Sequence, residues 1–142
     1  MEQIVNPLQT SLGRLKMNSP VTVASGTFAL ENLDFIAQEH LGAYVCKTIT
    51  RNPKKGNPPP RLYETEAGLL NSIGLQNPGL DKFIEEELPT LKEKLTVPLI
   101  VSFSGSSFAE FAQMLEALEK QEGIAGYELN VSCPNVENEG IT

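Results

Sequence analysis

Hydrophobic and polar positions follow two different periods along this chain, and the alternation predicts strands separated by helices. Short apolar runs rich in β-branched residues predict strands at 20–24, 43–48, 97–102 and 126–131. Apolar positions spaced three and four residues apart predict helices at 32–40, 80–95 and 108–118. Asn32 is the expected cap of the first helix, and Pro89 is expected to kink the second. The connection 49–78 is rich in proline and is predicted to hold neither a helix nor an internal strand.

This order of elements predicts a parallel sheet with crossover helices. An open, doubly wound sheet would bind a cofactor at its first turn, but the turn 24–29 matches no glycine-rich phosphate motif. The other closure is a (β/α)8 barrel, which needs about 250 residues. The predicted fold class is therefore α/β, the N-terminal half of a (β/α)8 barrel with about four parallel strands. Residues 1–142 form a single partial domain in this interpretation.

Composition narrows the function classes. The chain has 142 residues and a formal net charge of −7, which disfavours a nucleic-acid role because phosphate binding needs a basic face. It has no apolar run near the roughly 20 residues of a membrane span and no signal-peptide pattern at its start, so a cytoplasmic location is expected. Two cysteines and one histidine, His40, disfavour a zinc site and a Ser-His-Asp triad, and no metal is expected. His40 is interpreted as a helix-end residue.

The carboxyl ends of the predicted strands carry the candidate chemistry, because sites of parallel α/β proteins lie there. Lys47 closes an apolar strand, and it is either a positive charge in a site or a side chain that snorkels at the rim. Cys46 should face the opposite side of that strand as a buried, inert residue. Cys133 follows the last strand, where a thiol can act as nucleophile or proton acceptor if its neighbours favour the thiolate.

The long connection offers two further candidates. Amides and glycines in 69–79 suit contact with a planar polar ligand, although turn formation alone favours the same residues. The basic residues of the connection are interpreted as a solvated face rather than an anion site; they are Arg51, Lys54, Lys55 and Arg61.

Four motifs in fixed order resemble one family. They are Asn18-Ser-Pro-Val-Thr-Val-Ala-Ser-Gly26, Gly56-Asn-Pro-Pro-Pro-Arg61, Asn71-Ser-Ile-Gly-Leu-Gln-Asn-Pro-Gly79 and Asn130-Val-Ser-Cys-Pro-Asn135. Together they resemble the catalytic subunit of class 1 dihydroorotate dehydrogenases, (β/α)8 flavoproteins of pyrimidine biosynthesis. The third motif is closer to the B subtype, which works with a second subunit, than to the A subtype. The resemblance runs from about Val5 to Gly140 and covers the first half of the barrel.

The resemblance implies a role for each matching residue. FMN would contact Ser25, Lys47, Thr48, Asn130 and, with a serine where many B-subtype members have asparagine, Ser102. Dihydroorotate would contact Lys47, Asn71, Ser72, Ile73, Gly74, Leu75, Asn130 and Asn135. Cys133 would be the base that removes the C5 proton while hydride passes from C6 to FMN, giving orotate. Implied partners are a second copy, in a homodimer, and a subunit that carries FAD and an iron-sulfur cluster.

Two alternatives remain at this stage. The family's later strands and its loops for the FMN phosphate have no counterpart in these residues, so we expect a truncated product or a segment of a longer protein. With open edges and an uncovered inner face, the chain could then be an inactive half-barrel or scaffold that aggregates or depends on a partner half. The other alternative is an aldolase that forms a Schiff base on Lys47.

Overall fold

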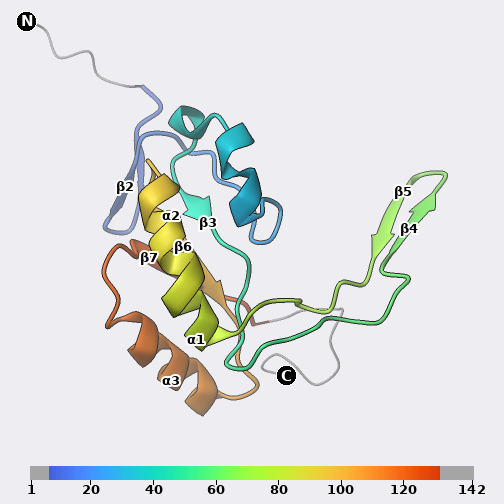
Figure 1. Cartoon of the computed structure of the whole chain (residues 1–142). Helices are drawn as coiled ribbons and strands as arrows, with labels where there is room; N and C mark the ends of the chain where they lie inside the picture. Colours follow the sequence, from blue (N-terminus) through green and yellow to red (C-terminus); the bar gives the residue numbers. More distant parts are fainter. Residues whose placement is uncertain (1–6, 132–142) are drawn as a thin grey trace, which may run out of the picture.

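Three parallel strands form the central sheet of the computed structural model, which describes residues 7–131 (Figure 1). The strands are β3 (Tyr44–Val45), β6 (Leu99–Phe103) and β7 (Gly126–Leu129), and they lie in the order β3-β6-β7. Helical segments connect β3 to β6 and β6 to β7. The expected parallel α/β arrangement is therefore confirmed.

The strand predicted at 20–24 is reduced to a single bridge. Thr22 pairs in parallel with Ala43, and the Gly42 N–H donates to the Val21 carbonyl at 2.8 Å. Pro20 has no N–H to donate, and the chain turns away at Ala24, whose carbonyl accepts from the Thr27 N–H at 3.1 Å. The segment thus runs beside β3, but the regular sheet has three strands where four were predicted.

The prediction of one α-helix at 32–40 is also wrong. Two short 3₁₀ helices replace it, η1 (Leu30–Phe35) and η2 (Gln38–His40). Asn32 lies inside η1 rather than at its start, and Ile36 has extended backbone angles that separate the two turns. The prediction that His40 ends a helix is confirmed, because η2 stops there.

The helix predicted at 80–95 forms with an irregular middle. It runs as α1 (Leu80–Lys82), a π-helical turn η3 (Phe83–Glu87) and α2 (Leu88–Lys94). Pro89 lies in the first turn of α2, where its missing N–H is tolerated, and the wider π turn comes just before it. The expected kink thus takes the form of a π turn.

The helix predicted at 108–118 is confirmed as α3 (Phe108–Leu118). Ser107 caps it by accepting the Glu110 N–H at 3.2 Å, and the Glu110 carboxylate accepts from the Ser106 N–H at 2.6 Å. This reciprocal pattern satisfies donors at the helix start. The two hydrogen bonds from Ser106, through its hydroxyl and its N–H, hold the pKa of Glu110 below its ordinary value.

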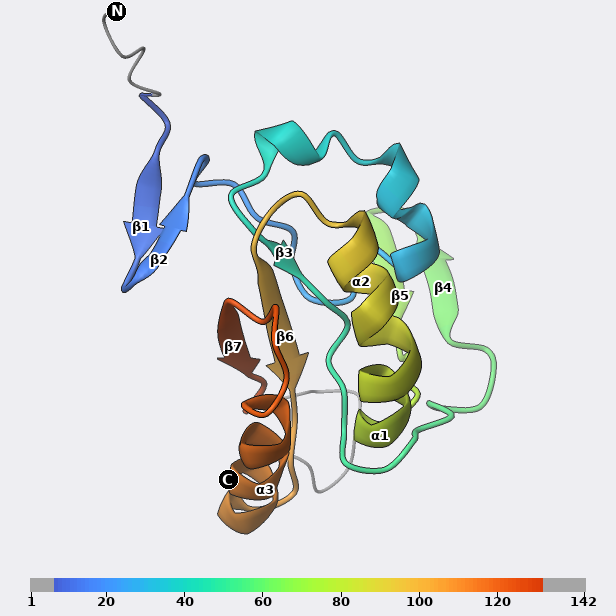
Figure 2. The ribbon, with the colours of Figure 1, turned by 60° about the vertical axis from the view of Figure 1, so that its left-hand side comes forward.

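Two antiparallel hairpins were not predicted. The first joins β1 (Thr10–Leu12) to β2 (Leu15–Met17). The second joins β4 (Leu62–Thr65) to β5 (Gly68–Asn71) within the proline-rich connection. Both are edge strands of a separate two-stranded sheet, so the prediction that 49–78 holds neither a helix nor an internal strand is confirmed. This second hairpin projects away from the sheet and helices in Figure 1, whereas the view of Figure 2 looks along it, behind α2.

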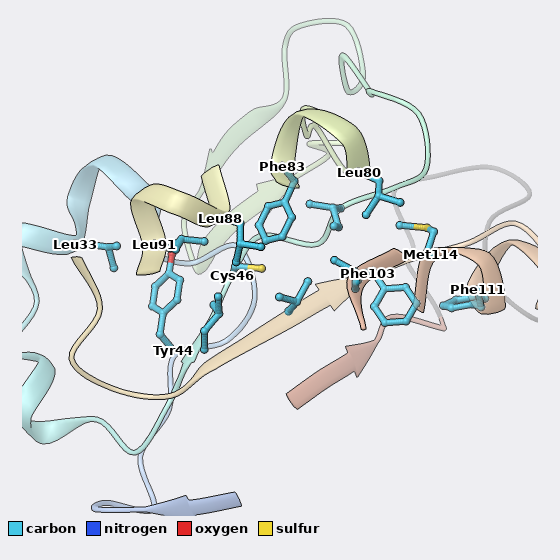
Figure 3. Close-up of a cluster of buried hydrophobic side chains, with 14 residues drawn as sticks. Leu33, Tyr44, Cys46, Leu80, Phe83, Leu88, Leu91, Phe103, Phe111 and Met114 are labelled. Carbon is cyan, nitrogen blue, oxygen red and sulfur yellow. The ribbon is translucent and has the colours of Figure 1, made fainter. Parts of the chain in front are cut away.

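The main core lies between the sheet and its helices (Figure 3). Phe103 of β6 packs against Phe111 of α3 with ring centroids 5.6 Å apart and meets Tyr127 of β7 edge-on at 6.4 Å. Cys46 belongs to this core, which confirms the predicted burial. A smaller cluster covers the opposite face of the sheet and consists of Met17, Ala43, Val45 and Ile100. Within residues 7–131, no helix has both the length and the apolar character needed to cross a bilayer.

Candidate functional site

A β-bulge shapes the carboxyl end of the first sheet strand. Val45 pairs with Ile100, but the next bridge pairs Ile49 with Phe103, so four steps along one chain match three along the other. The hydrogen bonds agree, because the Cys46 N–H donates to Ile100 and the following donor to the sheet is Ile49, which bonds Ser102. The extra residue shifts the side-chain alternation beyond Cys46.

The bulge brings three of the predicted flavin contacts together. The Thr48 and Ser102 hydroxyl oxygens lie 2.9 Å apart, and the Asn130 amide donates to Thr48 Oγ1 at 3.3 Å. Thr48 and Ser102 are buried, whereas Asn130 is partly exposed. We call these three residues the strand-end cluster. It presents hydroxyl and amide groups from three different strand ends at one place.

Lys47 lies beside the strand-end cluster but is held by a different segment. A side chain at Gly26 would come within 3.0 Å of Lys47 Cδ and Nζ, so the lysine packs on the glycine backbone. Gly26 also has φ +77°, which favours glycine. Ser25, the remaining predicted flavin contact, is partly buried in the same turn. The predicted turn that contains Ser25 and Gly26 is thus the surface against which the Lys47 side chain packs.

A cavity of about 660 Å³ opens next to Lys47. Its lining joins the 26–31 turn, β3, the proline-rich connection and the α1–α2 helix. Lys47, Lys54 and Lys55 contribute positive charge, while Glu31 and Glu87 contribute negative charge. Burial, and next the charge of Glu31, raise the pKa of Glu87 above its ordinary value. The cavity therefore has mixed charge with two carboxyl groups close enough to interact.

Cys46 and Tyr44 also line this cavity, and burial keeps both groups protonated. Burial raises the pKa of the Cys46 thiol to about 12 and that of Tyr44 to about 12. Tyr44 donates its hydroxyl to the Phe28 carbonyl at 2.7 Å. Cys46 and Lys47 both line this cavity, although Cys46 packs in the main core and Lys47 packs against Gly26. Cys46 stays inert, as predicted, since its thiol does not ionise near neutral pH.

The segment predicted to hold the substrate lies along the same cavity but is mostly turned away from it. Ile73 lines the cavity with Lys47, whereas Asn71 and Ser72 are exposed at the end of the β4–β5 hairpin. Gly74 and Leu75 are buried and have φ of +75° and +52°. A positive φ is uncommon for leucine, so this turn is held by its surroundings.

Asn57 is one such support. It donates its backbone N–H to the Ile73 carbonyl at 3.0 Å and its side-chain amide to Ser72 Oγ at 2.8 Å. A side chain at Gly74 would lie 2.6 Å from Asn57 Oδ1, so this close approach needs glycine. The motif containing Asn57 was noticed in the sequence, but its role as a support for 72–74 was not.

Asn77 is a second support that the sequence did not reveal. Its amide donates to Thr50 Oγ1 at 2.9 Å and to the Leu75 carbonyl at 2.7 Å. Its carbonyl oxygen accepts the N–H groups of Thr50 at 3.1 Å and Gly79 at 2.9 Å. Because Asn77 is buried with partners on both sides of its amide, it ties the two ends of the long connection together. The Asn-Pro-Gly sequence indicated only a turn.

The basic residues of the connection differ from one another. Arg61 donates to Gln76, to the Asn57 carbonyl and, at 2.9 Å, to the Lys55 carbonyl. Arg51 forms an ion pair with Asp81 at 2.6 Å. Both arginines thus bind neighbouring segments, and the Arg51–Asp81 pair is exposed to solvent, in keeping with the interpretation as a solvated face. Two predicted site residues, Cys133 and Asn135, lie outside residues 7–131 and are not placed.

Comparison with known proteins gives a consistent result. Residues 7–142 match the family described as dihydroorotate dehydrogenase. The "Dihydroorotate dehydrogenase B (NAD(+)), catalytic subunit" of Thermoanaerobacter pseudethanolicus is 51% identical over 136 residues, covering 94% of this chain and 44% of that protein. The protein of the same name from Bacillus caldolyticus is 45% identical over 139 residues, covering 96% and 44%. This chain thus spans less than half the length of these curated relatives.

A solved structure supports the fold. The structure described as DHODH in complex with ferulenol, from Eimeria tenella, matches 96% of this chain with a TM-score of 0.65 and 20% identity. The match covers 39% of that larger chain. The likeness, together with the parallel sheet, confirms the expected fold class, part of a (β/α)8 barrel. From its sequence match and its fold, this chain belongs to the dihydroorotate dehydrogenase family.

Proposed function

We propose that the native protein containing this chain oxidises dihydroorotate to orotate with FMN, a reaction of pyrimidine biosynthesis. The observation that carries the proposal is the strand-end cluster of Thr48, Ser102 and Asn130, with Lys47 beside it, in a chain of this family. Hydroxyl and amide groups meet at the carboxyl ends of parallel strands, where sites of this fold class lie, and the neighbouring Lys47 packs against Gly26.

The donor set of these residues fits a flavin. The ring system of FMN carries carbonyl and nitrogen atoms along one edge, and hydroxyl and amide groups can bond either kind of atom. Thr48, Ser102, Asn130 and Lys47 are the proposed ring contacts, and Ser25 is proposed beside them. When bound, FMN supplies the acceptor for the hydride that leaves C6 of the substrate.

The chain's own residues would position the substrate and move its proton. The Lys47 ammonium is the proposed partner of the substrate carboxylate, because Lys47 both packs against the turn at Gly26 and lines the cavity. The segment 71–75, Asn130 and Asn135 would bond the ring. Cys133 is the proposed base for the C5 proton, and a thiol with an ordinary pKa near 8.5 gives this step an alkaline optimum unless its surroundings lower that value.

The proposed partners follow from the same family. The relatives' name, catalytic subunit of a B enzyme that uses NAD(+), supports a second subunit for electron transfer, which we propose carries FAD and an iron-sulfur cluster. We also propose a homodimer of the catalytic chain and a cytoplasmic location.

Purification of the native protein tests the proposal. We expect bound flavin in its visible absorption spectrum and flavin reduction on mixing with dihydroorotate. Cys133→Ala should slow that reduction by two orders of magnitude or more, about the range of general-base effects. Cys46→Ala is the matched control, because its buried thiol does not ionise and reduction should continue. Native protein that is colourless and cannot be reconstituted with FMN would overturn the proposal.

The 142-residue chain by itself gives the complementary measurement. It spans 44% of the length of its relatives and has no counterpart of the family's later loops for the FMN phosphate, so we expect weak FMN binding or none. Flavin fluorescence during titration measures this. Steady turnover by the isolated chain would contradict the expectation and exclude the inactive half-barrel.

A further inference from the structure

The buried Asn77 side chain makes the full set of hydrogen bonds that an amide can form. Its nitrogen donates to Thr50 Oγ1 at 2.9 Å and to the Leu75 carbonyl at 2.7 Å. Its oxygen accepts the N–H groups of Thr50 at 3.1 Å and Gly79 at 2.9 Å. The Thr50 hydroxyl has its shortest acceptor in the Asn52 carbonyl, at 2.7 Å, which leaves Oγ1 to accept from Asn77. Both donors and both acceptor sites of the amide are thus used, so its orientation is fixed.

Thr50 is anchored to the sheet at the strand-end cluster. It directly follows Ile49, whose N–H donates to the Ser102 carbonyl at 3.0 Å and whose carbonyl accepts the Ser104 N–H at 2.9 Å. The Ser102 hydroxyl also contacts Thr48, so Thr50 lies two residues beyond a proposed flavin contact, on backbone that is paired with β6. The Thr50 end of the Asn77 amide is therefore fixed relative to the sheet.

Leu75 is the opposite partner of the amide and lies in the proposed substrate segment. Its φ of +52° is uncommon for a residue with a side chain and has to be held by neighbouring groups. Asn77 is one of these groups, because it donates to the Leu75 carbonyl from two residues away. Leu75 and Asn77 are 6% and 7% exposed, and every partner of the amide lies within 50–79. The contact therefore does not depend on a surface that further parts of a longer chain would cover.

We propose that Asn77 is a positioning residue of the reaction, which fixes the substrate segment relative to the flavin contact at Thr48. This inference rests on the proposed function, which assigns dihydroorotate to 71–75 and the flavin to Thr48. Hydride transfer requires the substrate carbon and the flavin to meet in one geometry, and a misplacement of about 1 Å can slow a reaction about a hundredfold. Because one amide bonds both segments, it limits the movement of one relative to the other.

Exchange of the amide for a carboxylate removes the two donors and keeps the acceptors. In Asn77→Asp, the N–H groups of Thr50 and Gly79 retain an oxygen, whereas the Leu75 carbonyl faces an oxygen in place of its donor. In the native protein, we expect bound flavin and its reduction by dithionite to equal the parent. Orotate, titrated by calorimetry, should bind at least about tenfold more weakly, and flavin reduction at saturating dihydroorotate should be at least about tenfold slower.

Gln38 provides a matched control at the opposite end of the sheet. Its amide donates to the Lys94 carbonyl at 3.1 Å and accepts the Thr96 N–H at 2.9 Å, just before β6 begins. Gln38→Glu therefore makes the same chemical change in a link between two backbone segments, away from the strand-end cluster. It should leave orotate affinity and the rate of flavin reduction within about twofold of the parent. Equal weakening by Gln38→Glu and Asn77→Asp, or parent-like values in Asn77→Asp, would overturn the proposal.

Asn77→Ser is a second variant for the case in which the carboxylate disturbs folding. Serine retains an oxygen for the Gly79 N–H, but its single hydroxyl hydrogen cannot serve both Thr50 and Leu75. Asn77→Ser with bound flavin should bind orotate at least about threefold more weakly, and binding equal to the parent would contradict the proposal. Loss of flavin from both Asn77 variants would also contradict it, because Asn77 would then hold the flavin strand itself. A parent whose flavin is not reduced by dihydroorotate would instead contradict the proposed function.

Discussion

The strand-end cluster and the long connection beside it are held by opposite means. Thr48 and Ser102 are fixed by the register of a buried parallel sheet, so the backbone determines where their side chains lie. The segment 71–79 is fixed by side chains, mainly Asn57, Arg61 and Asn77, that bond the backbone of a neighbouring loop. The comparison teaches that one candidate site combines a part held by backbone pairing in the sheet with a part held by side-chain hydrogen bonds.

Removal of a core side chain should affect the sheet most. Phe103→Ala deletes a fully buried ring that packs on Phe111 and Tyr127, and we expect a loss of about 3–5 kcal/mol in the free energy of unfolding. Leu69→Ala on the hairpin is the control and should change it by less than about 0.5 kcal/mol. Urea unfolding measures both. Similar losses would show that the hairpin is part of the same core.

Loss of Asn77 should open the long connection and spare the sheet. Asn77→Ala leaves the N–H groups of Thr50 and Gly79 without their acceptor, and we expect a loss of about 1–3 kcal/mol. Hydrogen exchange should accelerate across 50–79 and stay unchanged in β6. The exposed Asn52→Ala serves as control. Faster exchange in β6 to the same degree would contradict the separation of the two regions.

Removal of the Thr48 hydroxyl should lower the free energy of unfolding less than Phe103→Ala or Asn77→Ala does. Thr48→Val keeps the shape but removes the partner of Ser102 and the acceptor of Asn130, and we expect a loss of about 1 kcal/mol. Thr48→Ser retains the hydroxyl and should recover most of that loss. Chemical unfolding of the two variants measures both losses, and a larger loss for Thr48→Ser than for Thr48→Val would mean that packing of the Thr48 methyl group, rather than hydrogen bonding, holds the strand end.

The smallest effect concerns Glu87, in the cavity between the two regions. Its pKa is raised in the folded chain by burial and by Glu31, so the folded chain binds this proton more tightly than the unfolded chain does. Stability from this group is present below the unfolded pKa, about 4.3, and is lost as pH rises through the higher folded value. Glu87→Gln should therefore be more stable than the parent near pH 7 and equal to it below about pH 4. Thermal unfolding across this range tests the sign, and a variant less stable at pH 7 would contradict it.

The parts of the fold that were predictable are those with strong local signals. The helix 108–118 has a regular apolar period and a serine cap, and β6 is a continuous apolar run. The prediction of a strand at 20–24 was wrong, because a run of apolar residues does not indicate how many of them pair with a neighbouring strand, and here only Thr22 does. The β4–β5 hairpin was not predicted. Its apolar residues are exposed, so they do not follow the alternation of buried and exposed positions by which a strand on a core is recognised.

The sequence could predict those residues of the candidate site that follow the carboxyl ends of strands. Thr48, Ser102 and Asn130 follow three different strands, and parallel pairing alone brings such ends together. The supports at Asn57, Arg61 and Asn77 act between segments far apart in the sequence, so no local pattern indicates them. The bulge after Val45 could not be predicted from the local sequence either, because it is defined by the pairing of this segment with β6.

That bulge has a consequence for which side chains one strand brings to its carboxyl end. In an unbroken strand, neighbouring side chains point to opposite sides of the sheet, so Lys47 and Thr48 would lie on different faces. The additional residue frees Lys47 to reach toward the loops and still leaves Thr48 opposite Ser102. Two consecutive positions thereby place an ammonium group against the turn at Gly26 and a hydroxyl group against Ser102, both at the carboxyl end of the sheet.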